Sequence, residues 1–158
     1  TKSLEDQLKN CTAKWKIVTC HHSVFSPARG RDFKFARENW KPLLDKYNVD
    51  LVLNGHDHTY ARGHVPVRTS DSDTAELGTV YVTSVSGPKQ YGLDRKQILA
   101  YKSQGYRSDM TAEQTQFFQV ISIEDNTLSY VAYTVMGDEY DRATIIKDFA
   151  TGKKSLKD

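Results

Sequence analysis

The stretch Asp50-Leu51-Val52-Leu53-Asn54-Gly55-His56-Asp57-His58 joins a short apolar run to a pair of histidines. Its first five residues have the composition of a buried β-strand, and the Asn-Gly step after them is typical of a turn. Gly55 is expected either to take a positive φ or to leave room for a close approach of the backbone. The stretch therefore predicts a strand that carries two imidazoles in the loop at its carboxyl end.

A second stretch nearer the amino terminus has the same arrangement. Residues 16–20 are rich in β-branched side chains and precede His21 and His22, so they too are expected to form a buried strand. Between the two strands, residues 35–47 show apolar side chains at helical spacing, with Pro42 inside the run. Strand, helix and strand form a βαβ unit with parallel strands. Since parallel strands end at one edge of a sheet, His21 and His56 are expected to meet there.

Imidazoles gathered at such an edge are a common way for a protein to hold transition metals. We therefore interpret His21, His56 and His58 as candidate metal ligands. His22 stays open between three roles: a neighbour of the ligands, a contact of the substrate, and a spectator. His64 stands apart from both clusters and is expected to be an ordinary hydrogen-bonded residue.

Basic residues near the two clusters are candidates for substrate binding. Arg29 and Arg31 follow the first histidine pair, and the forked donors of guanidinium suit phosphate oxygens. The alternative for both is ordinary surface charge. Arg62 follows the second cluster and is expected either to pair with a carboxylate or to position that loop, while Tyr60 is expected to pack beneath the histidine turn.

The remaining sequence predicts mostly β-structure. Alternating apolar residues predict a strand over 78–84, a hairpin over 116–123 and 127–135 that is buried on both faces, and a last strand over 143–149. Polar composition predicts a loop over 69–76 and a long surface loop over 89–115 that contains a short helix over 93–103. Residues 1–150 are expected to form one domain portion, followed by a solvated polar tail over 151–158.

Composition limits the partners. The 158 residues carry 22 Lys and Arg against 20 Asp and Glu, so a net charge of +2 predicts no extended nucleic-acid surface. No stretch reaches the roughly 18 apolar residues of a membrane span, so no membrane segment is expected. Cys11 and Cys20 are able to form one disulfide, but the position of Cys20 in an expected strand favours a buried free thiol.

Two motifs resemble a known family. Val18-Thr19-Cys20-His21 has the V-x-x-H form, and Gly55-His56-Asp57-His58 the G-H-x-H form, of the calcineurin-like metallophosphoesterases. The following Thr59-Tyr60-Ala61-Arg62 resembles the purple acid phosphatase branch. The resemblance implies that His21 and His56 bind one ion, and His58 the other, of a binuclear centre. The ions would be divalent or of mixed valence, with Fe, Zn or Mn as the candidates.

The family's other motifs, which supply aspartate and asparagine ligands, do not occur in this chain. The resemblance therefore predicts the carboxyl-terminal half of a phosphoesterase domain. Its expected fold class is α/β (α+β mixed): half of a four-layer β-sandwich flanked by helices. The implied activity is metal-dependent hydrolysis of phosphoric esters by the full-length protein, as a phosphatase or phosphodiesterase. This chain alone is expected to bind metal partly and to turn over little, and no catalytic residue is assigned in it.

The partners implied are a phosphate ester, the missing amino-terminal half and a second copy of the chain held through exposed strands. Export to a periplasm or to the extracellular space is implied by the resemblance alone. Two other functions stand beside this one. A non-catalytic interaction domain on the same scaffold would have lost its metals, yet the three histidines fit the family pattern. An unrelated structural zinc domain would need a closed set of four ligands, for which no Cys-x-x-Cys pair is present.

Overall fold

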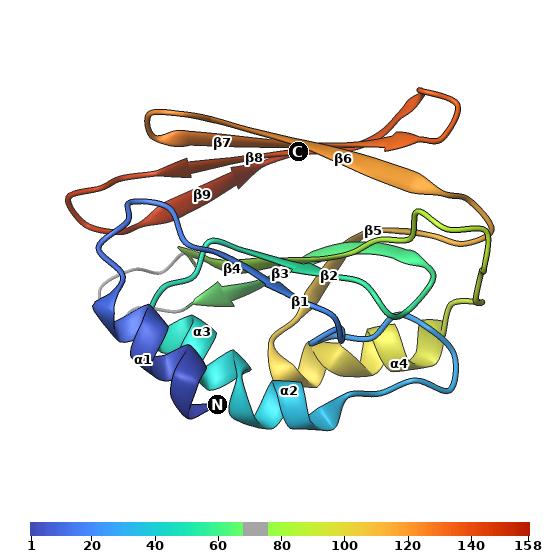
Figure 1. Cartoon of the computed structure of the whole chain (residues 1–158), viewed down its shortest axis with the longest axis horizontal. Coiled ribbons are helices and arrows are strands. Elements are labelled where there is room, and N and C mark those ends of the chain that lie inside the picture. The colour runs from blue at the N-terminus through green and yellow to red at the C-terminus, as the bar shows by residue number, and fades with distance from the viewer. Residues whose placement is uncertain (68–75) are drawn as a thin grey trace.

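A computed structural model describes residues 1–67 and 76–158 of the chain. Three layers lie on top of one another: helices, a five-stranded sheet and a four-stranded sheet (Figure 1). The helices are α1 (Lys2–Asn10), α2 (Lys34–Asn39), α3 (Lys41–Lys46) and α4 (Arg95–Ala100), followed by the 3₁₀ helix η1 (Tyr101–Gln104). The strands are β1 (Ile17–Cys20), β2 (Leu51–Asn54), β3 (Tyr60–Val67), β4 (Glu76–Thr83), β5 (Arg107–Ala112), β6 (Phe117–Glu124), β7 (Thr127–Thr134), β8 (Glu139–Lys147) and β9 (Lys154–Lys157).

The first sheet has the strand order β1-β2-β4-β3-β5, and the second has the order β6-β7-β8-β9. Strand β2 runs parallel to both β1 and β4, whereas β3 is antiparallel to β4 and β5. All pairs of the second sheet are antiparallel. The parallel βαβ arrangement and the mixed α+β fold class are therefore confirmed.

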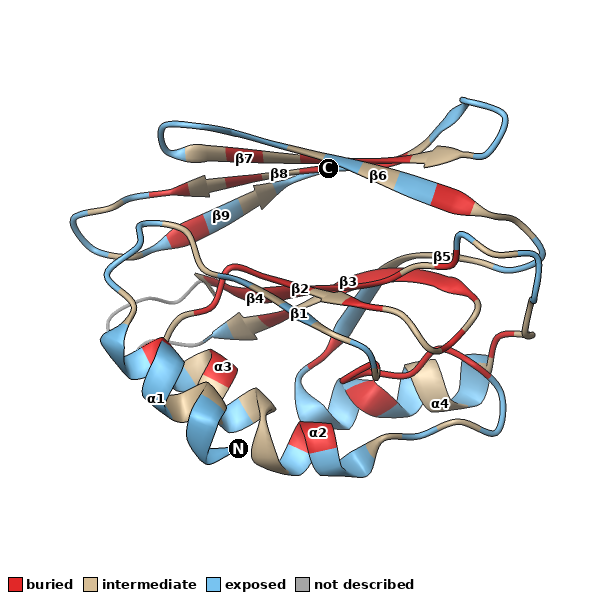
Figure 2. Cartoon of the chain, viewed as in Figure 1, coloured by how far each residue is buried: buried red, intermediate tan, exposed pale blue. Residues whose placement is uncertain are grey.

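Apolar side chains form two buried clusters, one on each side of the first sheet. Figure 2 shows that buried residues are concentrated in the strands of this sheet. One cluster fills the space between the sheets and includes Leu51, Tyr60 and Phe117. The other lies between the first sheet and the helices and includes Val52, Leu44 and Phe25. Because successive residues of a strand point to opposite faces, Leu51 and Val52 serve different clusters and both are fully buried.

The helix predicted over 35–47 is two helices. Trp40 ends α2 and precedes α3, and Pro42 lies in the first turn of α3. Proline is tolerated there because the first N–H groups of a helix have no partner within the helix, so the chain turns at Trp40 without losing an interior hydrogen bond.

Burial of β1 and β6 was predicted wrongly. β1 forms one edge of the first sheet, and Ile17 is 38% exposed. β6 forms an edge of the second sheet, and its outer face leaves Phe118 and Val120 about half exposed, while its inner face buries Phe117. An apolar composition does not distinguish a strand covered on both faces from one covered on a single face.

Strands β3 and β5 were not predicted. Gly63 and Pro66 within β3 are residues that usually interrupt strands. Pro66 follows an irregularity in the pairing with β4 that begins at His64. At Gly63 a Cβ atom would collide with the carbonyl oxygen of Arg107 and the hydroxyl of Tyr106, so the close packing of β3 on β5 requires glycine. The short helix expected over 93–103 is present as α4 and η1, but part of the expected surface loop is β5.

The solvated tail was also predicted wrongly for residues 154–157. They form β9, which pairs with β8, and the side chain of Lys154 is buried. Lys154 Nζ donates to the carbonyl of Val49, and Lys147 Nζ donates to both carboxylate oxygens of Asp50. A buried carboxylate therefore holds the carboxyl end of the chain against the first sheet. The loop predicted over 69–76 lies almost wholly outside the described residues, and the division at residue 150 stays a prediction.

Within the described residues, no helix has the length and apolar character needed to cross a membrane.

Candidate active site: a histidine pocket at the sheet edge

The register of β1 and β2 brings the two histidine clusters together. Cys20 pairs with Asn54 at the ends of the two strands, and Gly55 N donates to the carbonyl of His21 over 3.1 Å. The two loops therefore leave the sheet side by side. Nδ1 of His56 lies 3.0 Å from Nε2 of His21. The predicted meeting of His21 and His56 is confirmed.

The turn that carries His56 has an unusual backbone. His56 itself takes the positive φ, at 62°, and Gly55 does not. A Cβ atom at Gly55 would meet its nearest neighbours at 3.8 Å, which is an ordinary contact. The prediction for Gly55 was therefore wrong on both counts, because the left-handed residue is the next one. Such a conformation is uncommon for a residue with a side chain and often occurs at functional sites.

Three imidazoles pack around one another. The ring centroids lie 4.9 Å apart for His21 and His56, 4.3 Å for His22 and His56, and 5.2 Å for His21 and His22. Phe33 covers the other side of His22 at 4.5 Å. His22 is therefore a neighbour of the candidate ligands and part of the pocket wall.

His58 points to different partners. Its Nδ1 lies 2.8 Å from the carbonyl oxygen of Lys89, and its ring lies 4.9 Å from that of Tyr91. Because a carbonyl only accepts, Nδ1 carries the proton and Nε2 of the neutral ring keeps its lone pair. This is the arrangement in which a backbone carbonyl orients a metal-binding histidine.

Asn54 fixes the loop that holds His21 and His22. Its side-chain nitrogen donates to the carbonyl oxygens of Cys20 and His22, both over 3.1 Å, and its side-chain oxygen accepts from Val24 N over 3.4 Å. Asn54 was predicted only as the last residue of a strand and the start of a turn. Its position in the strand-ending Asn-Gly pair gave no indication that it spans to the neighbouring loop.

Both cysteines are free, so the free-thiol interpretation of Cys20 is confirmed. Burial raises the pKa of the Cys20 thiol, although the hydrogen bond from Asn54 acts in the opposite direction. A neutral thiol in this position is a packing residue.

A pocket of about 570 Å³ opens beside the imidazoles. Its lining comes from the loop after β1, the turn after β2 and the loop before α4: His22, Ser23, Ser26, Arg29, Gly30, Arg31, Asp32, Phe33, His56, Asp57 and Tyr91. Arg29 and Arg31 therefore lie beside the histidines, as their sequence positions suggested. Tyr91 was missed, because it lies in a segment that reads as a surface loop.

Arg31 contacts two other residues of the pocket lining. Its Nη2 donates to the hydroxyl of Tyr91 over 2.8 Å, and its Nη1 contacts Nε2 of His56. Since guanidinium only donates, Nε2 of His56 accepts, and the ring proton sits on Nδ1, where it is donated to His21. Burial lowers the pKa of His56, and the neighbouring His22 and Arg31 lower it further. The ring is therefore neutral at physiological pH.

The acidic residues of the pocket do not fully neutralise its basic side chains. Asp32 is bound by Arg37 through both of its oxygens, and the nearby guanidinium lowers the pKa of that carboxyl. Asp57 is buried, and one of its carboxylate oxygens has no hydrogen-bond partner. With Asp32 paired to Arg37, the two positive charges of Arg29 and Arg31 exceed the one negative charge of Asp57, so the pocket favours anions.

The donor atoms fit a metal ion in part. Two nitrogens that each lie about 2.1 Å from one ion are separated by about 3.0 Å at the right angle of octahedral coordination and by about 3.4 Å at the tetrahedral angle that zinc prefers. The separation between His21 Nε2 and His56 Nδ1 has the first of these values. Within residues 1–67 and 76–158, no group of three or more His, Cys, Asp or Glu side chains is arranged to hold an ion. The described chain thus offers two converging ligands, with His58 held apart from them.

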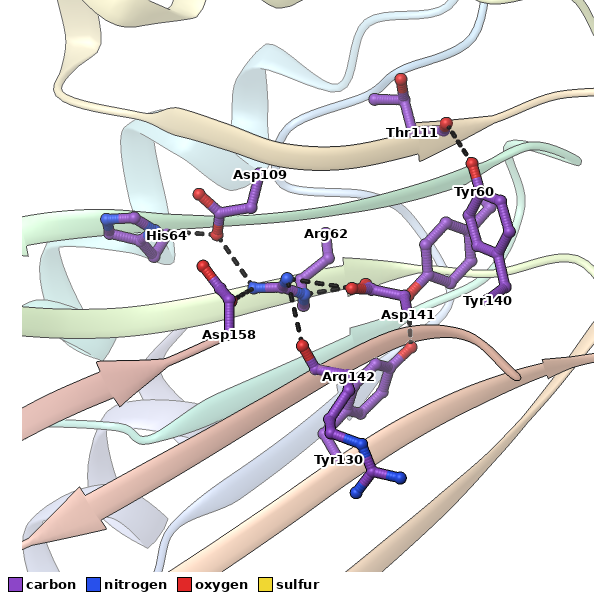
Figure 3. Close-up of polar contacts among 10 residues, drawn as sticks. All are labelled: Tyr60, Arg62, His64, Asp109, Thr111, Tyr130, Tyr140, Asp141, Arg142 and Asp158. Atoms are coloured by element: carbon purple, nitrogen blue, oxygen red, sulfur yellow. Dashed lines mark hydrogen bonds and ion pairs between the residues drawn. The ribbon is translucent and has the colours of Figure 1, made fainter.

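Arg62 takes no part in the pocket. It is buried and binds Asp141 through Nε and Nη2, while its Nη1 pairs with Asp109 and Asp158 (Figure 3). His64 bonds Asp109 over 2.8 Å, which confirms its ordinary hydrogen-bonded role. Tyr60 donates to Asp141 over 2.6 Å. The carboxylate interpretation of Arg62 is therefore confirmed, and its partners come from both sheets.

Comparison with known proteins agrees with the motifs. Residues 2–60 match the family described as Calcineurin-like phosphoesterase. Purple acid phosphatase 4 of Arabidopsis thaliana is 30% identical over 141 residues, which cover 85% of this chain and 35% of the relative. Purple acid phosphatase 17 of the same plant is 32% identical over 115 residues, covering 68% and 31%. The solved structure of purple acid phosphatase PPD1 from yellow lupin (Lupinus luteus) seeds matches with a TM-score of 0.67 at 20% identity, over 94% of this chain and 28% of that chain.

The two motifs and these matches show that the chain is similar to the calcineurin-like phosphoesterases, and among them to the purple acid phosphatases. The structural match shows that the fold is shared. It spans about a third of the length of the curated relatives it matches. This similarity favours the phosphoesterase interpretation over the unrelated structural zinc domain considered above.

Proposed function

We propose that this chain contributes part of the active site of a metal-dependent phosphoric ester hydrolase. The observation that carries the proposal is the 3.0 Å separation of His21 Nε2 and His56 Nδ1, which suits two ligands of one ion. In this proposal His58 binds a second ion through Nε2, the nitrogen left free by its bond to Lys89. Bound Fe, Zn or Mn ions would acidify a coordinated water and withdraw charge from the phosphoryl oxygens.

The chain's own basic residues bind and orient the substrate in this proposal. Arg29 and Arg31 present guanidinium groups to the pocket, where forked donors match the oxygens of a phosphate ester. His22 packs against His56 and limits the space beside it. A phosphate ester is favoured over a neutral ester because the positive charge of the pocket is not balanced by Asp32, which Arg37 already binds.

We infer that ligands from outside this chain complete the centre. Carboxylates that bridge two ions offset their charge, and three imidazoles do not supply that charge. Metal binding by the 158-residue chain is therefore expected to be weak, and hydrolysis by this chain alone is expected to be slow. The full-length protein is the proposed enzyme, and the amino-terminal part of the domain is its proposed internal partner.

Calorimetric titration of the chain with Zn²⁺ and with Mn²⁺ tests the metal site. We expect His21→Ala and His56→Ala each to weaken binding about tenfold or more. His64→Gln is the matched control, because His64 bonds Asp109 away from this edge. Equal affinities for all four proteins would contradict the proposal.

Hydrolysis of p-nitrophenyl phosphate is then compared between this chain and the full-length protein, and rapid turnover by this chain alone would refute the part-site proposal.

The second candidate is a non-catalytic interaction domain on the same scaffold. It is favoured by one observation: the described residues provide no group of three donor side chains around one point. A chain and a full-length protein that both fail to bind Zn²⁺ or Mn²⁺ would support this alternative. Retained metal binding in the full-length protein would exclude it.

Self-association is a further proposal, based on exposed apolar strands. Phe118 and Val120 on the outer face of β6 are 48% and 46% exposed, and β1 is an open edge of the first sheet. Such features favour pairing with another chain. Light scattering is expected to give a dimer or larger species, and a monomer at high concentration would contradict this.

Export of the full-length protein stays a prediction that rests on the family resemblance. Fractionation of cells that express the full-length protein tests it.

A further inference from the structure

Tyr91 lies between two groups already placed at the site. Its hydroxyl accepts from Arg31 Nη2 over 2.8 Å, and its backbone N–H donates to the carbonyl of His58 over 2.9 Å. The carbonyl of Lys89, two residues earlier, lies 2.8 Å from Nδ1 of His58. The segment 89–91 is thus joined both to a candidate metal ligand and to a candidate substrate-binding residue.

Two cations lie against the ring of Tyr91. The guanidinium carbon of Arg31 is 4.6 Å from the ring centroid, and Nζ of Lys89 is 5.3 Å from it. Both distances suit cation–π interactions. The hydroxyl and the ring of Tyr91 therefore hold the guanidinium of Arg31 in two ways, and Lys89 adds a second positive charge at the same rim.

The hydroxyl of Tyr91 is the anchor that Arg31 would keep in a metal-loaded site. Arg31 has two side-chain partners, Tyr91 and Nε2 of His56. If His56 binds a metal through Nδ1, its proton moves to Nε2, and that nitrogen no longer accepts from a guanidinium. Arg31 would then leave His56 and keep its bond to Tyr91, with Nη1 free for another acceptor.

We propose that Tyr91 is a positioning residue that holds Arg31, with Lys89 beside it, as an oxyanion-binding subsite for the phosphate group of the substrate. The inference rests on the proposed phosphoesterase function and adds a residue to it. The ligand class is a tetrahedral oxyanion, such as a phosphate monoester or inorganic phosphate, whose oxygens meet the forked donors of Arg31.

The experiment uses the metal-free 158-residue chain with inorganic phosphate as the probe, followed by ¹⁵N NMR of the backbone and of the arginine side chains. Phosphate is expected to shift the signals of Arg31 Nε and of residues 89–91. Tyr91→Phe keeps the ring and removes the hydroxyl, and it is expected to weaken phosphate binding about tenfold, the lower end of the range for one hydrogen bond to a charged group. Tyr133→Phe, on the far sheet, is the matched control and is expected to leave binding unchanged.

A double-mutant cycle separates positioning from a merely structural role. If Tyr91 acts through Arg31, then Tyr91→Phe weakens phosphate binding in the wild-type background but has little effect in Arg31→Ala. Additive effects of the two substitutions would overturn the proposal, and so would a Tyr91→Phe affinity equal to that of wild type. Because no metal is present, this readout is independent of hydrolysis. If Tyr91 and Arg31 are coupled in phosphate binding but the chain and the full-length protein bind no metal, only the proposed function is contradicted. If metal binds but the two residues are not coupled, only this inference is contradicted.

Discussion

Nε of Arg62 on β3 donates to Oδ2 of Asp141 on β8 over 2.8 Å, so a buried ion pair joins the two sheets. Both side chains are almost completely buried. Asp109 and Asp158 bind the same guanidinium from β5 and from the end of the chain. One arginine therefore binds carboxylates that come from three different segments.

We expect Arg62→Met to lower the free energy of unfolding by about 3–5 kcal/mol, because it leaves Asp141 buried without its cation. Urea denaturation measures the change. Arg142→Met is the control, since Arg142 pairs with Glu139 at an exposed position where such pairs contribute little. If the two variants unfold at the same urea concentration, the network does not hold the sheets together.

The buried side chain of Lys154 is expected to raise the free energy of unfolding at alkaline pH. Burial lowers the pKa of Lys154 to about 8, although Asp50 opposes the shift. Above that pKa the unfolded chain, whose lysine titrates near 10.4, binds more protons than the folded chain, so the free energy of unfolding increases with pH. Between about pH 8 and pH 9.5 the contribution is about 1–2 kcal/mol.

Chemical denaturation at a series of pH values tests this. Lys154→Met is expected to lose the rise, whereas Lys157→Met, on the same strand but exposed, is expected to keep it. A rise of equal size in Lys154→Met would show that another group causes it. The buried tyrosines have raised pKa values and act in the opposite direction above about pH 10, so the comparison ends below that pH.

A side chain at position 63 is expected to destabilise the fold by steric crowding. Gly63→Ala places a methyl group against the carbonyl oxygen of Arg107 and the hydroxyl of Tyr106, and β3 must move away from β5. We expect a loss of about 1–3 kcal/mol in thermal or urea unfolding, as for other overpacked sites. Gly87→Ala is the control, because a Cβ there meets nothing within 4 Å. Because Gly→Ala alone stabilises a chain by lowering the entropy of its unfolded state, a Gly63→Ala variant as stable as Gly87→Ala would rule out crowding at Gly63.

Removal of the Arg31 side chain is expected to increase the affinity of the site for a metal ion. Its guanidinium repels a cation at His56 and stabilises the ring tautomer whose Nδ1 carries the proton. Arg31→Ala is therefore expected to bind Zn²⁺ about three- to tenfold more tightly in calorimetry. Arg29→Ala removes the same charge from the pocket rim without the contact to His56 and is expected to change affinity less. A lower affinity in Arg31→Ala would rule out this competition.

Local pattern was sufficient for much of the fold. The apolar runs before His21 and Gly55 form the parallel strands β1 and β2, and the hairpin of β6 and β7 lies where alternation predicts it. Pattern was insufficient where a residue's effect depends on distant neighbours. Gly63 and Pro66 interrupt strands in general, yet here one allows close packing and the other follows a local irregularity in strand pairing.

The sequence by itself determined which side chains are candidates for the chemistry and, through the rule for parallel strands, that His21 and His56 share one edge. Only the tertiary structure decided that His56 takes the left-handed conformation, that Asn54 spans two loops and that Tyr91 reaches Arg31. The physical reason is the distance along the chain over which each kind of interaction acts. Hydrophobic periodicity acts over a few residues, whereas these contacts join segments that are brought together only when both layers of the core are packed.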